Sequence, residues 1–344
     1  MRFILYPFSL IYLVISNIRN YLFDLNILKS TSFPYPIICV GNLSLGGTGK
    51  TPHVDYLVSI LKDKYKIAVI SRGYGRKTNK FYYVQKNFNS KLVGDEPLML
   101  KKKYPNIIIA VNNKRKEAIN KIKIDFPDVE VFLMDDGFQH RWVKAGLNIL
   151  ITSFDKPFYN DHIFPYGNLR ETKKNIKRAN IIVVSKIPKD VTVEEQKKVI
   201  NKINAKKNQE IYFSQIKYTG IKCLNTSNLI KKSLKNYNIT LVTGLANSNY
   251  IKNYLNQNNC SLFKHLKYKD HHEYTHDDCK RILNTYNKDN SIKKVILTTE
   301  KDSVKLSKFI AYFENTNFYV LQIKIDFIKE EKIKQKIFDY VKKN

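Results

Sequence analysis

The stretch VGNLSLGGTGKTP, residues 40–52, decides the fold that we expect for this chain. The apolar run 35–40 (YPIICV) before it is typical of a buried strand, and residues 53–63 behind it carry apolar side chains at helical spacing. Glycines between a strand and a helix let backbone N–H groups turn toward phosphate oxygens, and the helix N-terminus adds a positive dipole. The sequence therefore predicts a phosphate-binding loop.

Roles within this loop follow from the residue types. Lys50 is expected to reach the β- and γ-phosphates of a nucleotide, and the Thr51 hydroxyl is expected to bind Mg²⁺. The pattern G-x-x-x-x-G-K-[ST] is not met strictly, because Ser44 stands where its first glycine belongs. The alternative is an ordinary glycine turn before a helix. The expected nucleotide-binding residues are Ser44, Leu45, Gly46, Gly47, Thr48, Gly49, Lys50 and Thr51.

Short apolar strands recur after this loop, with helical segments between them. We expect them at 66–71, 107–111, 129–134, 147–152 and 181–185. This alternation favours an α/β fold with a parallel, P-loop NTPase-like sheet. A second series of strands and helices begins at Ile239, and predicts a smaller C-terminal α/β domain. The expected divisions are an N-terminal helix at 1–28, a P-loop domain at 29–224 and the smaller domain at 225–344.

The composition limits the partners without choosing among them. The 344 residues carry a formal net charge of +30, which favours anionic partners such as nucleotides, lipid headgroups or nucleic acid. Lysine and asparagine are abundant throughout, so many of these charges are expected on solvated faces. The four cysteines are widely spaced and include no C-x-x-C pair, which indicates a reducing cytoplasm rather than a disulfide framework.

Residues 3–15 (FILYPFSLIYLVI) are almost entirely apolar. The run is shorter than the roughly 18 residues of a membrane-spanning helix and lacks the small-residue cleavage site of a signal peptide. We therefore predict a helix lying in the membrane interface. The alternative is a helix that packs on the protein's own core.

Two further strands end in residues suited to an anionic ligand. Asp135 and Asp136 follow the strand 129–134, where carboxylates would lie beside the phosphate loop and bind Mg²⁺. Arg72 and Tyr74 follow the strand 66–71, on a glycine-containing loop suited to a ligand that is anionic and partly sugar-like. The alternatives are an acidic turn and an ordinary connecting loop.

Two segments allow competing interpretations. Asp95 suits the N-cap of a helix with Pro97 in its first turn, and this spacing alone predicts no catalytic role. In the run 270–276 (DHHEYTH), His272 and His276 have helical spacing for a metal site, but a third ligand is lacking. A histidine held by a carboxylate is favoured there, as a candidate acid or base.

Taken together, these motifs resemble the tetraacyldisaccharide 4'-kinase family, the lipid A 4'-kinases. They occur in family order over most of the chain, and the departure at Ser44 follows the family's own pattern. The matching motifs are VGNLSLGGTGKTP at 40–52, SRGYGR at 71–76, GDEP at 94–97, DDGFQHR at 135–141, P-x-G-x-L-R-E at 165–171, DHH at 270–272 and TEKD at 299–302.

The resemblance implies a peripheral or monotopic kinase of lipid A biosynthesis at the cytoplasmic face of the inner membrane. It would use ATP and Mg²⁺ to phosphorylate the 4'-hydroxyl of a tetraacylated glucosamine disaccharide 1-phosphate, an acidic lipid. No nucleic acid and no obligate protein partner is expected.

The motif match also implies roles for single residues. It makes Asp95 the catalytic carboxylate, paired with His271, and adds Lys50 to the catalytic set. A free Asp is a poor base for an alcohol, so His271 is expected to orient it and to offer the proton a second acceptor. The positions implied near the substrate are Arg72, Tyr74, Gln139, His140, Arg141, Arg170 and Glu171.

Two other classes of protein compete with this interpretation. Another P-loop enzyme, a small-molecule kinase or an ATPase, would share Lys50, Thr51 and Asp135 but would explain neither the apolar N-terminal run nor the DHH motif. A nucleic-acid-binding protein predicts a concentrated basic face, whereas the lysines here are dispersed.

Overall fold

The computed structural model describes residues 2–224, 229–230 and 233–344. Within these residues, thirteen strands form one sheet in the order β11-β10-β12-β13-β8-β7-β6-β1-β5-β2-β4-β3, with β9 paired to β8. Neighbouring strands are parallel except for β13 with β8, β3 with β4 and β9 with β8. The predicted α/β fold with a large, mostly parallel sheet is therefore confirmed.

The strands and helices have the following bounds. The strands are β1 (Ile37–Gly41), β2 (Ile67–Ser71), β3 (Tyr82–Tyr83), β4 (Ile108–Val111), β5 (Val131–Asp135), β6 (Leu147–Ser153), β7 (Ile181–Ser185), β8 (Glu210–Cys223), β9 (Leu229–Ile230), β10 (Asn238–Thr243), β11 (Ser261–Lys267), β12 (Lys294–Thr299) and β13 (Phe318–Phe327). The α-helices are α1 (Tyr6–Asp24), α2 (Lys50–Leu61), α3 (Ser90–Val93), α4 (Asp95–Lys103), α5 (Arg115–Asp125), α6 (Val193–Ile203), α7 (Asn249–Gln257), α8 (His276–Asn287), α9 (Glu300–Leu306) and α10 (Glu330–Lys342). Short 3₁₀ helices include η3 (Lys173–Arg178) and η4 (Ser307–Phe313).

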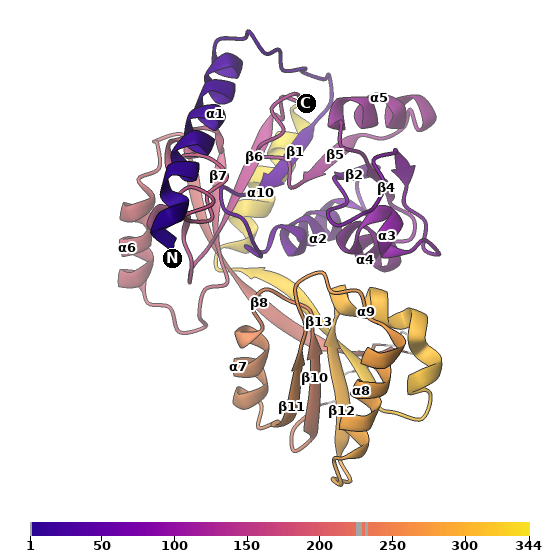
Figure 1. Cartoon of the computed structure of the whole chain (residues 1–344). Helices are drawn as coiled ribbons and strands as arrows, with labels where there is room; N and C mark the ends of the chain where they lie inside the picture. Colours follow the sequence, from indigo (N-terminus) through magenta and orange to yellow (C-terminus); the bar gives the residue numbers. More distant parts are fainter. Residues whose placement is uncertain (1, 225–228, 231–232) are drawn as a thin grey trace.

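The sheet passes through two lobes that are visible in Figure 1. We call β1–β7 with α1–α6 and α10 the N-terminal lobe, and β10–β12 with α7–α9 the C-terminal lobe. The strand β8 is longer than predicted and joins the lobes: its first residues pair with β7, and the rest of it pairs with β13. The predicted domain boundary at residue 225 lies outside the described residues.

The last helix, α10, returns to the N-terminal lobe, although the expected C-terminal domain included it. Ile333 and Ile337 are fully or almost fully buried in the same apolar cluster as Val40 of β1 and Leu57 of α2. The amphipathic spacing of the helix was visible in the sequence, but its packing partner was not, because an apolar stripe does not specify which face it will cover.

The phosphate loop lies between the centre of the sheet and α2. Strand β1 is flanked by β5 and β6, and Val40 is in register with Asp135, so the carboxyl ends of both strands meet at one edge. The chain then turns through Gly49, whose φ of 97° favours glycine, and α2 begins at Lys50 without a side-chain cap. Its first backbone N–H groups are therefore available to an anion.

Helix α1 has two different faces. Ser9, Asn20 and Phe23 are buried against the N-terminal lobe, so the alternative of packing on the protein's own core describes one face. The other face exposes more than half of each of its large apolar side chains Phe8, Ile11, Val14, Ile15, Ile18 and Tyr21. No helix in the described part of the chain is sufficiently long and apolar to cross a membrane.

Candidate active site

The backbone of the phosphate loop is fixed from two sides. On one side, the Leu45 N–H donates to the Asn168 carbonyl oxygen at 2.7 Å, and Ser44 forms an isolated bridge with Leu169. The serine in place of the first P-loop glycine is therefore paired with a neighbouring segment. Gly46 and Gly47 remain exposed, and a Cβ atom added to either would meet nothing within 4 Å. This leaves the open space that a polyphosphate needs.

Residues at the end of β7 hold the other side of the loop. The Ser185 hydroxyl donates to the Thr48 carbonyl oxygen at 2.6 Å, and Lys186 Nζ donates to the Gly47 carbonyl oxygen at 2.5 Å. The Thr48 hydroxyl accepts from Asn42 Nδ2 at 2.9 Å. These contacts fix the loop before any ligand binds, which reduces the entropy lost on binding.

The two strand-end carboxylates have different surroundings. Both oxygens of Asp136 accept from Arg170, at 2.9 and 3.0 Å, and Lys50 Nζ lies 3.5 Å from Asp136 Oδ1. Asp135 is 1% exposed, and its Oδ1 has no hydrogen-bond partner among the described residues. The structure thus brings Lys50, Asp135 and Asp136 together, as the sequence predicted.

Burial and nearby charges shift the pKa values of the two carboxyls in opposite directions. Burial, together with the charges of Glu96 and Asp136, raises the pKa of Asp135. Burial also acts on Asp136, but the charges of Lys50 and Arg170 outweigh it and lower the pKa of that carboxyl. A buried carboxyl with a raised pKa and an unpartnered oxygen is a position where an added cation would stabilise the ionised form.

Asp95 has a different role from the predicted N-cap. The helix α4 begins at Asp95, its N-cap is Gly94, and no side chain caps it. The Asp95 carboxylate instead accepts from Lys305 Nζ at 2.9 Å and from His271 Nδ1 at 3.1 Å. The capping interpretation was wrong because these buried partners come from the C-terminal lobe, which the local sequence does not reveal.

A close approach of two glycines places the Arg72–Tyr74 loop beside Asp95. A Cβ atom on Gly73 would lie 2.5 Å from the Val93 carbonyl oxygen, and a Cβ on Gly94 would lie 2.9 Å from Gly73. As a result, the Tyr74 ring lies 4.8 Å from the His271 ring, measured between centroids. Both Arg72 and Tyr74 are exposed, so a ligand can reach them.

Arg141 and Glu171, expected near the substrate, attach α1 to the rest of the N-terminal lobe. Arg141 donates to the Asn20 carbonyl oxygen at 2.8 Å and to Asp24 Oδ1 at 2.6 Å. Glu171 is 1% exposed and accepts from Asn20 Nδ2 at 3.3 Å and from Arg178 at 2.5 Å. Their predicted contacts with substrate stay predictions. In the structure, both residues hold α1 in place.

Gln139 and His140 continue this segment on the side of the phosphate loop. Gln139 Nε2 donates to the Asn42 carbonyl oxygen at 2.8 Å, and its backbone carbonyl accepts from Arg19 at 2.8 Å. Burial and the charges of Arg115 and Arg19 lower the pKa of His140 to about 4, and its Nε2 has no partner among the described residues. The predicted substrate contacts of both residues remain untested.

The other two histidines of the run 270–276, His272 and His276, each contact a different partner. His272 Nε2 lies 2.8 Å from Asp278 Oδ2, and His276 Nδ1 lies 2.9 Å from the Tyr312 hydroxyl. In the described residues, no group of three or more His, Cys, Asp or Glu side chains is placed to hold a metal ion. The helix α8 begins only at His276, so these two histidines do not share a helix face.

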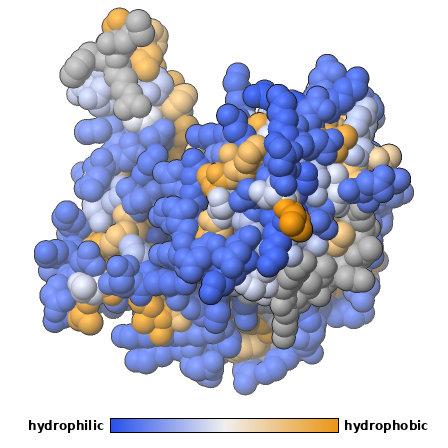
Figure 2. Space-filling model, turned by 90° about the horizontal axis from the view of Figure 1, so that it is seen from below, coloured by the Kyte–Doolittle hydropathy of each residue, from blue (hydrophilic) through white to orange (hydrophobic). Residues whose placement is uncertain are grey.

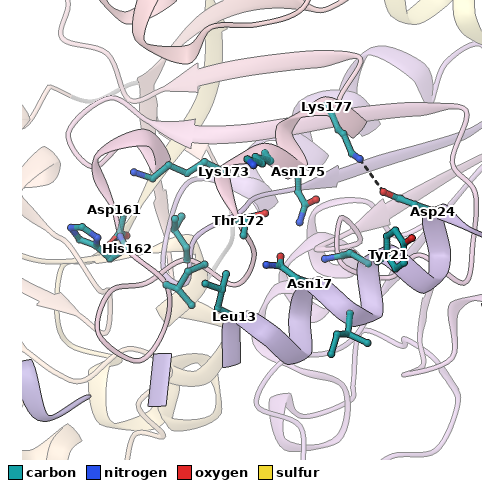
Figure 3. Close-up of a pocket in the computed structure, with 15 residues that line it drawn as sticks. Leu13, Asn17, Tyr21, Asp24, Asp161, His162, Thr172, Lys173, Asn175 and Lys177 are labelled. Carbon is teal, nitrogen blue, oxygen red and sulfur yellow. Dashed lines mark hydrogen bonds and ion pairs between the residues drawn. The ribbon is translucent and has the colours of Figure 1, made fainter. Parts of the chain in front are cut away.

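A cavity of about 780 Å³ lies between α1 and residues 161–177 (Figure 3). Leu13 and Tyr21 of α1 contribute to its apolar wall, and Lys173 and Lys177 lie on the opposite side. Lys177 Nζ is paired with Asp24 Oδ2 at 2.9 Å. None of the residues that line this cavity belongs to the phosphate loop.

A family model described as tetraacyldisaccharide-1-P 4'-kinase matches residues 1–342. The chain belongs to this family. Among its relatives, the tetraacyldisaccharide 4'-kinase of Flavobacterium johnsoniae is 39% identical over 100% of this chain and 98% of the relative. That of Bacteroides thetaiotaomicron is 36% identical over 99% of this chain and 93% of the relative.

A crystal structure of the 4'-kinase LpxK from Aquifex aeolicus, in complex with ATP, superimposes on the whole chain. The TM-score is 0.77, the sequence identity is 27%, and 99% of each chain is covered. The fold described here is therefore the fold of this 4'-kinase family. The family resemblance inferred from the ordered motifs is confirmed.

Several residues of this 4'-kinase family member enter the site without having been predicted. Arg115 is 3% exposed, and burial lowers its pKa to about 10 even though the charge of Asp136 opposes this effect. Its position at the start of α5, just after β4, was the available signal, since strand-end residues gather at one edge of a parallel sheet. Lys186 follows β7 in the same way, whereas Lys305 lies inside a helix and gave no such signal.

Proposed function

We propose that this protein is an ATP-dependent lipid kinase of lipid A biosynthesis. It transfers the γ-phosphoryl group of ATP to the 4'-hydroxyl of a tetraacylated glucosamine disaccharide 1-phosphate. The family match over residues 1–342 supports the substrate class. A soluble small-molecule kinase or an ATPase would share the phosphate loop, but family membership along the entire chain favours the lipid kinase over both.

The observation that carries the proposal is the arrangement of Lys50 and Asp95 on two sides of one site. Lys50 opens α2 beside the strand-end carboxylates, where its ammonium would neutralise phosphate charge. Glu96 is close enough for its charge to contribute to the raised pKa of Asp135, so the start of α4 faces these carboxylates. Asp95 would then accept a hydrogen bond from the 4'-hydroxyl, orient it for in-line attack and take up its proton as the phosphoryl group is transferred.

The residues present fit a bound Mg²⁺ at Asp135. Its buried Oδ1 lacks a partner among the described residues, and the buried Thr51 lies at the start of α2 beside the same strand ends. Mg²⁺ prefers oxygen ligands and commonly takes only one or two carboxylates together with substrate phosphates. The ion would neutralise charge on the phosphates. Asp136 would supply a second carboxylate ligand once its contact with Arg170 has been replaced by a contact with the ion.

The positive groups near the loop would bind the phosphates and balance the charge that develops on transfer. Arg170 already lies against Asp136, and Arg72 is exposed on the neighbouring strand end. Arg115 adds a buried cation whose interactions include Asp135 and Asp136. Charge stabilisation and positioning are the main contributions of a protein to phosphoryl transfer.

A transfer assay with a matched acceptor tests the proposed function. The protein is incubated with γ-labelled ATP, Mg²⁺ and detergent-solubilised tetraacyl disaccharide 1-phosphate, and the same lipid already phosphorylated at the 4'-position is the control. We expect label in the first lipid alone. Equal labelling of both lipids, or release of free phosphate without lipid labelling, would reject the kinase assignment.

We also propose that α1 attaches the protein to the cytoplasmic face of the inner membrane, as a peripheral or monotopic protein. The support is its exposed apolar face, where Phe8, Ile11 and Ile15 are 58%, 59% and 63% exposed. Such a face gains free energy on entering the headgroup region of a bilayer. Hydrophilic side chains dominate the face seen in Figure 2, and the proposal of membrane contact relies on the exposed apolar residues of α1.

Substitutions on the exposed face test this attachment better than removing α1, because the other face packs on the lobe. Ile11→Glu with Ile15→Glu should abolish co-sedimentation with phosphatidylglycerol vesicles and leave ATP binding intact. Ile124→Glu, at a 77% exposed position of α5, is the matched control. Vesicle binding that survives the double substitution would reject α1 as the attachment site.

A further inference from the structure

Two lysines of the C-terminal lobe hold the Asp95 carboxylate and its histidine. Both belong to α9 and are four residues apart, so they lie on the same side of that helix. Lys305 Nζ donates to Asp95 Oδ2 at 2.9 Å, and the Lys305 side chain is 1% exposed. Lys301 Nζ lies 3.1 Å from His271 Nε2 and 2.8 Å from Asp270 Oδ1.

The contact with Lys301 determines which nitrogen of His271 carries the proton. An ammonium group has only donors, so His271 Nε2 must accept from Lys301. The imidazole proton then resides on Nδ1, which donates to Asp95 Oδ2 at 3.1 Å. In this arrangement Nδ1 has no lone pair left for a proton from Asp95. The expectation that His271 offers the proton a second acceptor is therefore not met here.

Both donors to Asp95 reach the same oxygen. Among the described residues, the hydrogen bonds to this carboxylate come from His271 and Lys305, and both end on Oδ2. The carboxylate plane is fixed in this way, and Oδ1 is left for an incoming hydroxyl group. His271 adopts a φ of 60°, a left-handed conformation that is uncommon for a non-glycine residue.

We propose that Lys301 and Lys305 are positioning residues for the phosphoryl transfer, which act through His271 and Asp95 respectively. This inference rests on the function proposed above. Lys305 keeps Asp95 charged and oriented, and Lys301 keeps His271 in the tautomer that donates to Asp95. Neither lysine touches the reacting atoms in this arrangement.

The charges around Asp95 determine the pH effect of losing Lys305. Burial raises the pKa of Asp95, but the hydrogen bond from His271 and the charges of Lys305 and Lys301 outweigh it, so the pKa is lowered. Among the described residues, the acidic partners of Lys301 are Glu96, at 4.0 Å, and Asp270, at 2.8 Å. Both are acidic and oppose ionisation of Asp95. Without the Lys305 ammonium, the neutral carboxyl is therefore favoured up to a higher pH.

The first experiment compares Lys305→Met with Lys308→Met, which changes an exposed lysine of the adjacent η4. In Lys305→Met we expect kcat to fall on the order of ten- to a hundredfold, because a displaced catalytic group costs that much. The KM for ATP should not change, and the acid limb of the pH–kcat profile should move to higher pH. A folded Lys305→Met with the wild-type kcat and acid limb would overturn the proposal.

The second experiment uses Lys301, whose side chain is 14% exposed and therefore less buried than that of Lys305. It decides the case if Lys305→Met does not fold. Nitrogen-15 NMR of the full chain should show His271 protonated on Nδ1 in the wild type and in Lys301→Arg, which retains donors. Lys301→Met should lose this preference. Protonation on Nε2 in the wild type would overturn the proposal.

The NMR measurement needs no lipid. If the wild type fails to phosphorylate the lipid, the proposed function is rejected. The tautomer still decides whether the lysines hold Asp95 and His271 as described. Failure of the inference and failure of the proposed function are therefore distinguishable.

Discussion

The two sides of the candidate site differ in how they are built. The phosphate side, residues 44–51 with Asp135 and Asp136, lies within the N-terminal lobe. The Asp95 side joins α4 of that lobe to His271, Lys301 and Lys305 of the C-terminal lobe, and Asp95 and Lys305 are 210 residues apart in sequence. One side depends on local geometry, and the other depends on the packing of two lobes against each other.

The two sides also differ in how much space they leave. Gly46 and Gly47 on the phosphate side have nothing within 4 Å of an added Cβ atom, whereas Gly94 on the Asp95 side would meet Gly73 at 2.9 Å. The phosphate side has open space beside its glycines, whereas the backbone next to Asp95 is closely packed. We therefore expect substitutions on the phosphate side to affect ligand binding and chemistry, and substitutions on the Asp95 side to affect stability as well.

The largest effect is expected for Lys50→Ala. It removes the ammonium from the phosphate side, and kinase turnover should fall on the order of 10³-fold or more, because a preorganised charge next to the transferred group is lost. Thermal stability should stay near that of the wild type, since the contact between Lys50 and Asp136 is long, at 3.5 Å, and therefore weak. Turnover with the lipid acceptor and a thermal melt check both. A folded Lys50→Ala protein with full activity contradicts the nucleotide assignment.

On the other side, Asp95→Asn should lower turnover on the order of 10²-fold, since it removes the proposed acceptor of the hydroxyl proton. It should also destabilise the protein, because the buried Lys305 ammonium loses its ionised partner. The thermal melt thus separates the two sides: the change at Asp95 lowers the melting temperature and the change at Lys50 does not.

A double substitution tests whether Asp95 and His271 act as one unit. Asp95→Asn with His271→Ala should be scarcely worse than the worse single change, because residues that act together are not additive. His272→Ala is the control, since His272 contacts Asp278 instead of Asp95. Multiplicative losses in turnover would argue against the pair, and a greater effect at His272 would show that the wrong histidine was chosen.

Gly94→Ala tests the closed packing of the Asp95 side. Gly94 has a φ of 92°, and its added Cβ atom would meet the backbone of Gly73, so we expect a loss of about 1–3 kcal/mol in the free energy of unfolding. Gly47→Ala, where nothing lies within 4 Å, should leave that free energy unchanged in the absence of ligand. Denaturant unfolding measures both, and equal losses would remove the distinction between an open and a closed side.

The same comparison explains what could be predicted from the sequence. A strand, a glycine loop and a helix N-terminus follow one another between residues 35 and 63, so the phosphate side was predictable from one window. Asp95 fitted an N-cap equally well, because its partners His271 and Lys305 approach only after the lobes pack. The extension of β8 into the C-terminal lobe was missed for a similar reason, since the strand β13 that pairs with it lies about a hundred residues later.

The smallest expected effect concerns acid stability, where His140 and Asp95 differ in the pH range of their contributions. Burial and the charges of Arg115, Arg19 and Arg72 lower the pKa of His140, near the phosphate side, from 6.5 to about 4. At this histidine the unfolded chain therefore binds a proton below about pH 6.5, whereas the folded chain binds it only near pH 4, so the contribution of His140 to stability falls as the pH drops through this range. The pKa of Asp95 is lowered from 3.8, so the stability that its ion pair contributes is lost only below that value.

Replacing His140 by Asn should therefore reduce the slope of the unfolding free energy against pH between about 6.5 and 4. The reduction should correspond to up to about one fewer proton taken up on unfolding. Below pH 3.8 the loss of stability from Asp95 should remain in this variant, because the contacts with Lys305 and His271 are unchanged. Denaturant unfolding across this pH series supplies the slopes. An unchanged slope above pH 4 in His140→Asn would mean that His140 gains its proton equally easily in the folded and unfolded chains, and the acid response would not divide between the two sides of the site.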